Sequence, residues 1–194
     1  MREMIKLFII VAIFSAVAGG LLANVKGATE EKIDYNKLKY VQGPTIVSLL
    51  DGCSNDPLSD NFQITDGKKD LKFFIGAFDG NKNTIAFETF GKGYGGNVGV
   101  MVAINMDTDE IVGIGVTTHA ETPGMGARAK TDPGFPAQFK GKSILEPFNV
   151  TADGGDIDAL SGATITSRAV CAALMDASDI YKRLKDEIIK NITV

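Results

Sequence analysis

Four hydroxyl side chains gather where a long amphipathic segment of the chain begins: Ser161, Thr164, Thr166 and Ser167. At the start of a helix the first backbone N–H groups lack intrahelical partners and the helix dipole favours negative charge, so a phosphate group can bind there. Gly162 and Ala163 leave the approach open because their side chains are absent or small. The alternative is a helix cap, in which a serine or threonine only satisfies backbone donors. The residues alone leave both interpretations open.

The segment that follows these hydroxyls is predicted to be a helix that starts near Ala163 or Thr164 and ends at about Lys190. Its apolar residues recur at steps of three and four, which places them on one face of a helix. They are Val170, Leu174, Ala177, Ile180 or Tyr181, Leu184 and Ile188. We expect Cys171 to be buried in packing as well.

Four runs rich in β-forming residues precede this helix and are predicted to pair as two hairpins, 72–78 with 84–90 and 98–106 with 110–117. Short turns rich in Gly, Asp and Asn join the runs. Apolar residues alternate along 98–106, which places one apolar face toward a core. The stretch 91–96 is too rich in glycine to be predicted as a regular strand or helix. Neighbouring hairpins and a terminal helix predict an α+β domain with an antiparallel sheet.

The N-terminal segment is predicted to be a transmembrane helix. No charged residue lies between Lys6 and Lys26, and as a helix residues 7–25 would span roughly 28 Å at about 1.5 Å per residue. The hydrocarbon core of a bilayer is about 30 Å thick. Arg2 and Lys6 precede the span and favour a cytoplasmic N-terminus. A cleaved signal peptide is the alternative, because residues 16–18 resemble an Ala-x-Ala cleavage site, but apolar residues continue beyond it.

This interpretation divides the chain into four parts. We predict a cytoplasmic N-terminus at 1–6, a transmembrane anchor at 7–26, a connector at 27–70 and an extracytoplasmic domain at 71–194. The connector contains a short apolar patch at 46–50, and no role is assigned to it.

Composition and the rare residues exclude several kinds of site. A formal net charge of −4, with 24 acidic against 20 basic residues, gives no indication of a nucleic-acid partner. Cys53 and Cys171 are the only cysteines and lack C-x-x-C spacing, which argues against a cysteine-based metal site and favours two unrelated thiols over a disulfide. His119 is the only histidine, so a multi-histidine metal site is excluded, and we predict no catalytic or metal-binding residue. No G-x-G-x-x-G motif follows a predicted strand, so no NAD site is expected.

Three motifs resemble those of the FMN-binding domain family. Residues 158–164 match its flavinylation motif Asp-x-x-Ser-Gly-Ala-Thr, residues 119–126 its His-x-Glu-Thr-Pro-Gly-x-Gly loop, and residues 93–96 its Gly-Tyr-Gly-Gly turn. They occur in the family's order, and the resemblance covers roughly residues 85–180. In that family a dedicated flavin transferase uses FAD to attach FMN, through a phosphoester, to the threonine that aligns with Thr164.

The resemblance also implies roles for the residues around Thr164 and in the other two motifs. The residues expected to contact the cofactor are Ser161, Gly162, Ala163, Thr122, Gly124, Met125, Gly126, Gly93 and Tyr94. Those in the loop 119–126 are expected to border the isoalloxazine or ribityl part. Gly93 and Tyr94 are expected to line the same pocket, and Tyr94 is alternatively a core residue. Asp158 and Ser161 are expected to serve recognition by the transferase, and Asp158 is alternatively a solvated loop carboxylate.

The family includes the G subunit of Rnf complexes and the C subunit of sodium-pumping NADH:quinone reductases, and the short chain fits the former better. The resemblance thus implies an electron-transfer subunit, without a complete active site of its own, of an ion-translocating ferredoxin:NAD oxidoreductase in the inner (cytoplasmic) membrane. The implied partners are other membrane and iron–sulfur or flavin subunits. One alternative is a stand-alone extracytoplasmic covalent-FMN module of another reductase or respiratory regulator. Another is a non-redox, membrane-anchored binding protein in which the threonine motif is only a helix cap.

Overall fold

The computed structural model describes residues 2–67 and 69–193. The chain divides into two units, Met1–Tyr40 and Val41–Val194. The first unit contains helix α1 (Arg2–Lys37). The stretch Arg2–Glu30 has a mean hydropathy of 2.4, and none of its apolar window is buried within the structure. By length and composition this helix can cross a membrane.

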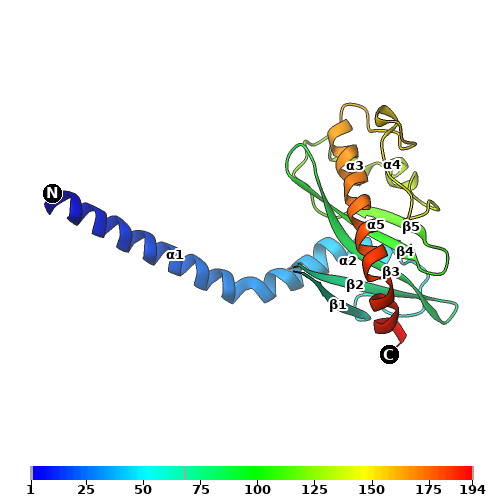
Figure 1. Ribbon diagram of the computed structural model, residues 1–194, viewed down its shortest axis with the longest axis horizontal. Helices are drawn as coiled ribbons and strands as arrows, with labels where there is room; N and C mark the ends of the chain where they lie inside the picture. The colour runs from blue at the N-terminus through cyan, green and yellow to red at the C-terminus, as the bar shows by residue number, and fades with distance from the viewer. Residues whose placement is uncertain (1, 68, 194) are drawn as a thin grey trace. The chain divides into compact units, whose positions relative to one another are not determined.

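The second unit is built on a five-stranded antiparallel sheet in the order β1-β2-β3-β4-β5 (Figure 1). The strands are β1 (Asn61–Asp66), β2 (Lys69–Phe78), β3 (Asn81–Lys92), β4 (Asn97–Asn105) and β5 (Glu110–Val116). Both predicted hairpins are confirmed, as β2–β3 and β4–β5. Asp79 and Gly80 join the first hairpin at φ values of 53° and 81°, the left-handed pair that a tight two-residue turn requires. β1 lies outside the predicted strands because only Phe62 and Ile64 are apolar in it.

Helix α5 (Thr164–Thr193) lies across one face of the sheet, over β3 and β4 (Figure 1). It begins where the sequence predicts, and every apolar position predicted for its inner face is buried, as is Cys171. The hydroxyl of Thr89 on β3 donates a 2.8 Å hydrogen bond to the carbonyl oxygen of Ala173, which joins helix and sheet inside the core. The predicted α+β fold, with an N-terminal apolar helix, an antiparallel sheet and a long C-terminal helix, is confirmed.

Gly91 corrects the expectation for the glycine-rich stretch 91–96. β3 continues through Gly91 and Lys92 and stays paired with β4 there. A Cβ atom at Gly91 would lie 1.8 Å from the carbonyl oxygen of Ala169 on α5. The glycine is therefore needed for close packing of the helix on the sheet, and the turn begins only at Gly93.

The opposite face of the sheet is also buried, which corrects the expectation of a single apolar face on β4. Met101 is fully buried although it alternates with the β4 residues that face α5. Helix α2 (Gly43–Leu49) packs on this face against β4 and β5, and its Ile46 is fully buried. A Cβ atom at Gly115 of β5 would lie 2.4 Å from Cγ2 of Thr45, so glycine gives α2 its place on the sheet.

Short elements complete the described chain: the π-helix η1 (Leu38–Gln42), α3 (Arg128–Thr131), α4 (Gly134–Ala137) and the 3-10 helix η2 (Thr151–Asp153). Cys53 and Cys171 are both free, as the sequence favours. Burial raises the pKa of the Cys171 thiol to about 11, so this cysteine is unreactive packing.

Candidate functional site

A cavity of about 540 Å³ opens where three segments of the second unit meet. The segments are the β3–β4 turn, the loop after β5, and the start of α5. The lining residues are Tyr94, Glu121, Thr122, Met125, Gly126, Gly162, Ala163, Thr164, Ile165 and Thr166. The three motifs of the sequence analysis therefore lie far apart in the chain but border one cavity.

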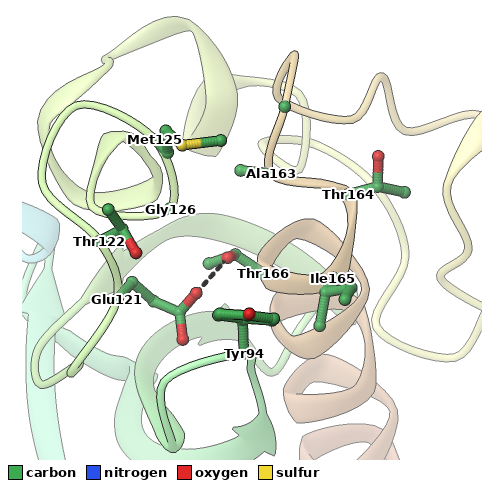
Figure 2. A pocket seen from close by; sticks show the side chains of 10 residues that line it. Tyr94, Glu121, Thr122, Met125, Gly126, Ala163, Thr164, Ile165 and Thr166 are labelled. Carbon is green, nitrogen blue, oxygen red and sulfur yellow. Dashed lines mark hydrogen bonds between the residues drawn. The ribbon is translucent and has the colours of Figure 1, made fainter.

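The walls of the cavity combine apolar and hydroxyl side chains. Figure 2 shows Thr122 and Met125 on one side, Thr164 and Ile165 on the other, and Tyr94 below. Met125, Ile165 and Tyr94 are 47%, 48% and 77% exposed, so large apolar surfaces remain uncovered around the opening. A flat aromatic ligand suits such walls, because its burial would cover these side chains.

The start of α5 is held by a serine inside the helix. Thr164 is the first helical residue, and Gly162 has a φ of 77°, which favours glycine in the tight turn before it. The backbone N–H of Leu160 donates to Oγ of Ser167 at 3.0 Å, and the same hydroxyl donates to the carbonyl oxygen of Ala163 at 3.1 Å. Ser167 thus closes the turn that presents Thr164.

The hydroxyls of this segment differ in their availability. Thr166 and Ser167 are buried and hydrogen-bonded, Thr166 to the carboxylate of Glu121. In the described part of the chain, the side chains of Ser161 and Thr164 make no hydrogen bond, and Thr164 is half-buried at the cavity wall. A capping hydrogen bond from either residue, which the helix-cap alternative requires, is therefore absent among the described residues.

Some predicted site residues lie beside the cavity and do not line it. Gly93 closes the β3–β4 turn, where its backbone N–H donates to the carbonyl oxygen of Gly96 at 2.8 Å. Gly124 has a φ of 75° in the turn between Thr122 and Met125. Ser161 is exposed at the turn before α5.

Asp158 is exposed, and it is held through its backbone. Its N–H donates to Oε1 of Gln138 at 2.7 Å, and its carbonyl oxygen accepts from Nε2 of Gln138 at 3.1 Å. The Asp158 carboxylate is therefore presented to solvent on an ordered backbone.

An ion pair joins the two ends of the segment that carries the Asp-x-x-Ser-Gly-Ala-Thr motif. Arg168 lies one turn after Thr164 and donates from Nε and Nη2 to the two carboxylate oxygens of Asp153, at 2.6 and 2.7 Å. The hydrogen bonds from Arg168 lower the pKa of Asp153. The pair links η2 to the second turn of α5, at the two ends of the loop 154–163.

Three lining residues were not among the predicted cofactor contacts: Glu121, Ile165 and Thr166. Glu121 belongs to the loop motif, and Thr166 is one of the four hydroxyls, but their contact with each other joins positions far apart in the chain. His119 accepts at Nδ1 from the backbone N–H of Glu121 at 3.3 Å.

Comparisons with known proteins agree with the three motifs. The model of the FMN-binding domain matches residues 93–179. The G subunit of the ion-translocating oxidoreductase complex of Cereibacter sphaeroides is 30% identical over 190 residues, which is 93% of this chain and 85% of that protein. The G subunit of the proton-translocating ferredoxin:NAD(+) oxidoreductase complex of Clostridium ljungdahlii is 35% identical, over 71% of this chain and 77% of that protein.

Among solved structures, the C subunit of the Na(+)-translocating NADH-quinone reductase from Parabacteroides distasonis superposes with a TM-score of 0.48. It is 27% identical in sequence, and the alignment covers 64% of each chain. The curated relatives match along most of their length, and the FMN-binding domain contains all three cavity-lining motifs. The chain belongs to the family of G subunits of ion-translocating oxidoreductase complexes, and it contains an FMN-binding domain.

Proposed function

We propose that this chain is the electron-carrying FMN subunit of a membrane-bound, ion-translocating ferredoxin:NAD oxidoreductase. The proposal is supported by relatives that are G subunits of ion-translocating oxidoreductase complexes, one of them a proton-translocating ferredoxin:NAD(+) oxidoreductase, and by the FMN-binding domain. The protein relays electrons between other redox subunits and completes no active site by itself. FMN, when bound, supplies the capacity to accept and release electrons, and the chain supplies its position and electrostatic surroundings.

The cavity fits this cofactor in size and chemistry. A volume of about 540 Å³ lies within the range of about 300–1,000 Å³ found for small-molecule and cofactor sites. Met125, Ile165 and Tyr94 offer apolar surface to the ring system, while the start of α5 offers backbone N–H groups and a favourable dipole to the phosphate. The lining therefore has an apolar part and an anion-binding part, as FMN itself has an apolar ring and a phosphate.

The proposal of covalent attachment rests on the position of the Thr164 hydroxyl and on its lack of a hydrogen bond within the described chain. It stands at the first residue of a long helix, borders the cavity, and makes no side-chain hydrogen bond with the described residues. In the proposed transfer, Thr164 Oγ bonds to the FMN phosphorus of FAD, the pyrophosphate bond breaks, AMP leaves, and the hydroxyl proton goes to solvent. Thr166 and Ser167 do not compete because their hydroxyls are buried and engaged.

The exposed flank of the site fits recognition by a flavin transferase. Asp158 and Ser161 are both exposed, and the backbone of Asp158 is held by Gln138. A transferase that binds this motif from the solvent side would contact both side chains in an ordered loop. Their role is therefore proposed to lie in maturation, while the cavity residues hold the cofactor.

The proposed topology places the FMN domain on the extracytoplasmic side. In it residues 1–6 are cytoplasmic, residues 7–26 span the bilayer, and residues 71–194 form the FMN domain. Residues 27–70, predicted to be a connector, also supply α2 and β1 to the second unit. The apolar stretch of α1 and the basic residues before it support this orientation. Covalent attachment would then prevent loss of the cofactor from that side of the membrane.

The test uses the full chain produced in membranes together with a flavin transferase. We expect a fluorescent band on a denaturing gel and an added mass of one FMN less one water. Thr164→Ala should lose both signals, whereas the control Thr151→Ala, which changes an exposed threonine of η2, should keep them. Unmodified wild-type protein from transferase-competent cells, or a modified Thr164→Ala chain, would contradict the proposal.

A further inference from the structure

Glu121 has an unusual environment for an acidic residue. The residue is only 6% exposed, and it is the one charged residue that is buried among those that the structure describes. It lines the floor of the cavity, below Thr122 and beside Tyr94 (Figure 2). Burying a carboxylate is costly unless hydrogen bonds or a cation compensate.

Hydrogen bonds from two other segments compensate the Glu121 carboxylate. Oε1 accepts from the backbone N–H of Gly95 in the β3–β4 turn at 2.8 Å, and Oε2 accepts from the hydroxyl of Thr166 on α5. No Lys, Arg or His of the described chain forms an ion pair with it. The carboxylate therefore connects all three segments that enclose the cavity while its charge stays unpaired.

Two neighbouring glycines make room for this carboxylate. A Cβ atom at Gly93 would lie 2.5 Å from Oε1 of Glu121, and one at Gly126 would lie 2.6 Å from Oε2. Both glycines were assigned to direct contact with the cofactor from the sequence. The structure adds a second reason for glycine at both positions, because a side chain at either would displace Glu121.

Hydrogen bonding alone does not require an acid at this position. A glutamine could accept from Gly95 through its carbonyl oxygen and donate to the Thr166 hydroxyl through its amide, so both contacts would survive. The carboxylate adds a negative charge at the wall of the cavity. In a poorly solvated site such a charge acts strongly on any charge placed beside it.

We infer that Glu121 is a positioning residue of the proposed FMN site, which holds the three walls together and whose charge lowers the reduction potential of the cofactor. The inference rests on the proposed function. A fixed negative charge beside the cofactor repels the negative charge that an added electron brings, so it disfavours reduction of the cofactor. The hydrogen bonds from Gly95 and Thr166 moderate this charge, because each donor draws electron density from the carboxylate.

The experiment measures the midpoint potential of the full, flavin-loaded chain by redox titration of its absorbance, with loading measured by intact mass. Glu121→Gln should load normally and titrate at a more positive potential than the wild type. Thr166→Val keeps the charge but removes one donor, so it should titrate at a more negative potential. The control Glu146→Gln changes the net charge equally at an exposed loop position and should leave the potential unchanged.

The opposite signs of the two shifts distinguish an electrostatic role from a general defect in packing, which would move both variants alike. Equal potentials of the wild type and Glu121→Gln, shifts of the same sign in both variants, or failure of a folded Glu121→Gln chain to load would each overturn the inference. A wild-type chain that does not load would instead overturn the proposed function. Glu121→Ala, which removes the contacts as well as the charge, should load several-fold less FMN.

Discussion

The two faces of the sheet are packed by different means. On the α5 face, glycine brings backbone against backbone, since a Cβ at Gly91 would lie 1.8 Å from the carbonyl oxygen of Ala169. On the α2 face, glycines meet the ends of side chains, since a Cβ at Gly115 would lie 2.4 Å from Cγ2 of Thr45. Backbone cannot yield without moving a whole element, whereas the end of a side chain can rotate.

This difference follows from whether each helix forms part of the cavity wall. The first turn of α5 forms one wall of the cavity, so the position of the helix on the sheet sets the width of the site. The hydrogen bond from Thr89 to Ala173 adds a second fixed point, one helical turn beyond Ala169. α2 contributes no residue to the cavity lining, and its contacts with the sheet can be softer.

The largest expected effect comes from Gly91→Ala. The new methyl group meets backbone atoms of α5, so helix and sheet must separate, and the free energy of unfolding should fall by about 3 kcal/mol or more. FMN loading should fall with it, because the α5 wall of the cavity moves. Urea unfolding of the full chain in detergent, followed by circular dichroism, measures the loss. A change below about 1 kcal/mol would show that α5 is as adjustable as α2.

A smaller effect is expected from Gly126→Ala in the cavity itself. Its Cβ would lie 2.6 Å from both Oε2 of Glu121 and Oγ1 of Thr166, which are side-chain atoms held in place by their mutual hydrogen bond. Overpacking of this kind should cost about 2 kcal/mol. Loading of FMN, measured by intact mass, should fall more than it does in a variant of equal stability altered on the α2 face. Normal loading would show that the Glu121–Thr166 contact is not needed to shape the cavity.

Gly115→Ala tests the α2 face, where glycines contact the ends of side chains. The new methyl meets a single side-chain methyl of Thr45, so we expect a loss of about 1 kcal/mol and unchanged FMN loading. Thr45→Ser removes the very atom that is too close. The double variant should therefore recover most of the stability, and a double-mutant cycle measures the coupling. Additive losses in the cycle would mean that the clash lies elsewhere.

The sequence predicted those features of the two sheet faces that depend on local patterns. Alternation along β4 and the three- and four-residue steps of α5 predicted which residues of these two elements are buried between helix and sheet. Each pattern is complete within its own element. The cofactor contacts implied by the family motifs supplied seven of the ten residues that line the cavity, all except Glu121, Ile165 and Thr166. The pairing of Gly91 with Ala169 was not predicted, because a glycine's partner depends on which element crosses it.

The second face was missed for a related physical reason. β4 presents Gly99 and Ala103 on either side of Met101 there, and these two small residues carry little hydrophobic signal although they permit close approach. Glu121 was missed as a structural residue because an acidic side chain in a loop is normally solvated, and only its two distant donors make burial possible.

The smallest expected effect concerns the edge of the α5 face, where Asp109 joins the β4–β5 turn to the helix. Its carboxylate accepts hydrogen bonds from Tyr181 and Lys185. Burial opposes ionisation, but the hydrogen bonds from Lys185 and Tyr181 and the charge of Lys185 outweigh it and lower the pKa of Asp109 below its ordinary 3.8. The contribution to stability is therefore fully present above pH 3.8 and is lost as the pH falls through the lower folded value.

Asp109→Asn isolates this contribution without straining the turn, because asparagine tolerates the φ of 57° at this position. The variant should be less stable than the wild type at pH 7 by no more than about 1 kcal/mol, since the ion pair is partly solvated. The difference should shrink below pH 3.8 as Asp109 is protonated in the wild type. Unfolding measured across this range decides the point. A difference that does not change with pH would mean that Asp109 holds α5 through hydrogen-bond geometry alone, leaving the backbone contact at Gly91 as the main anchor of the helix.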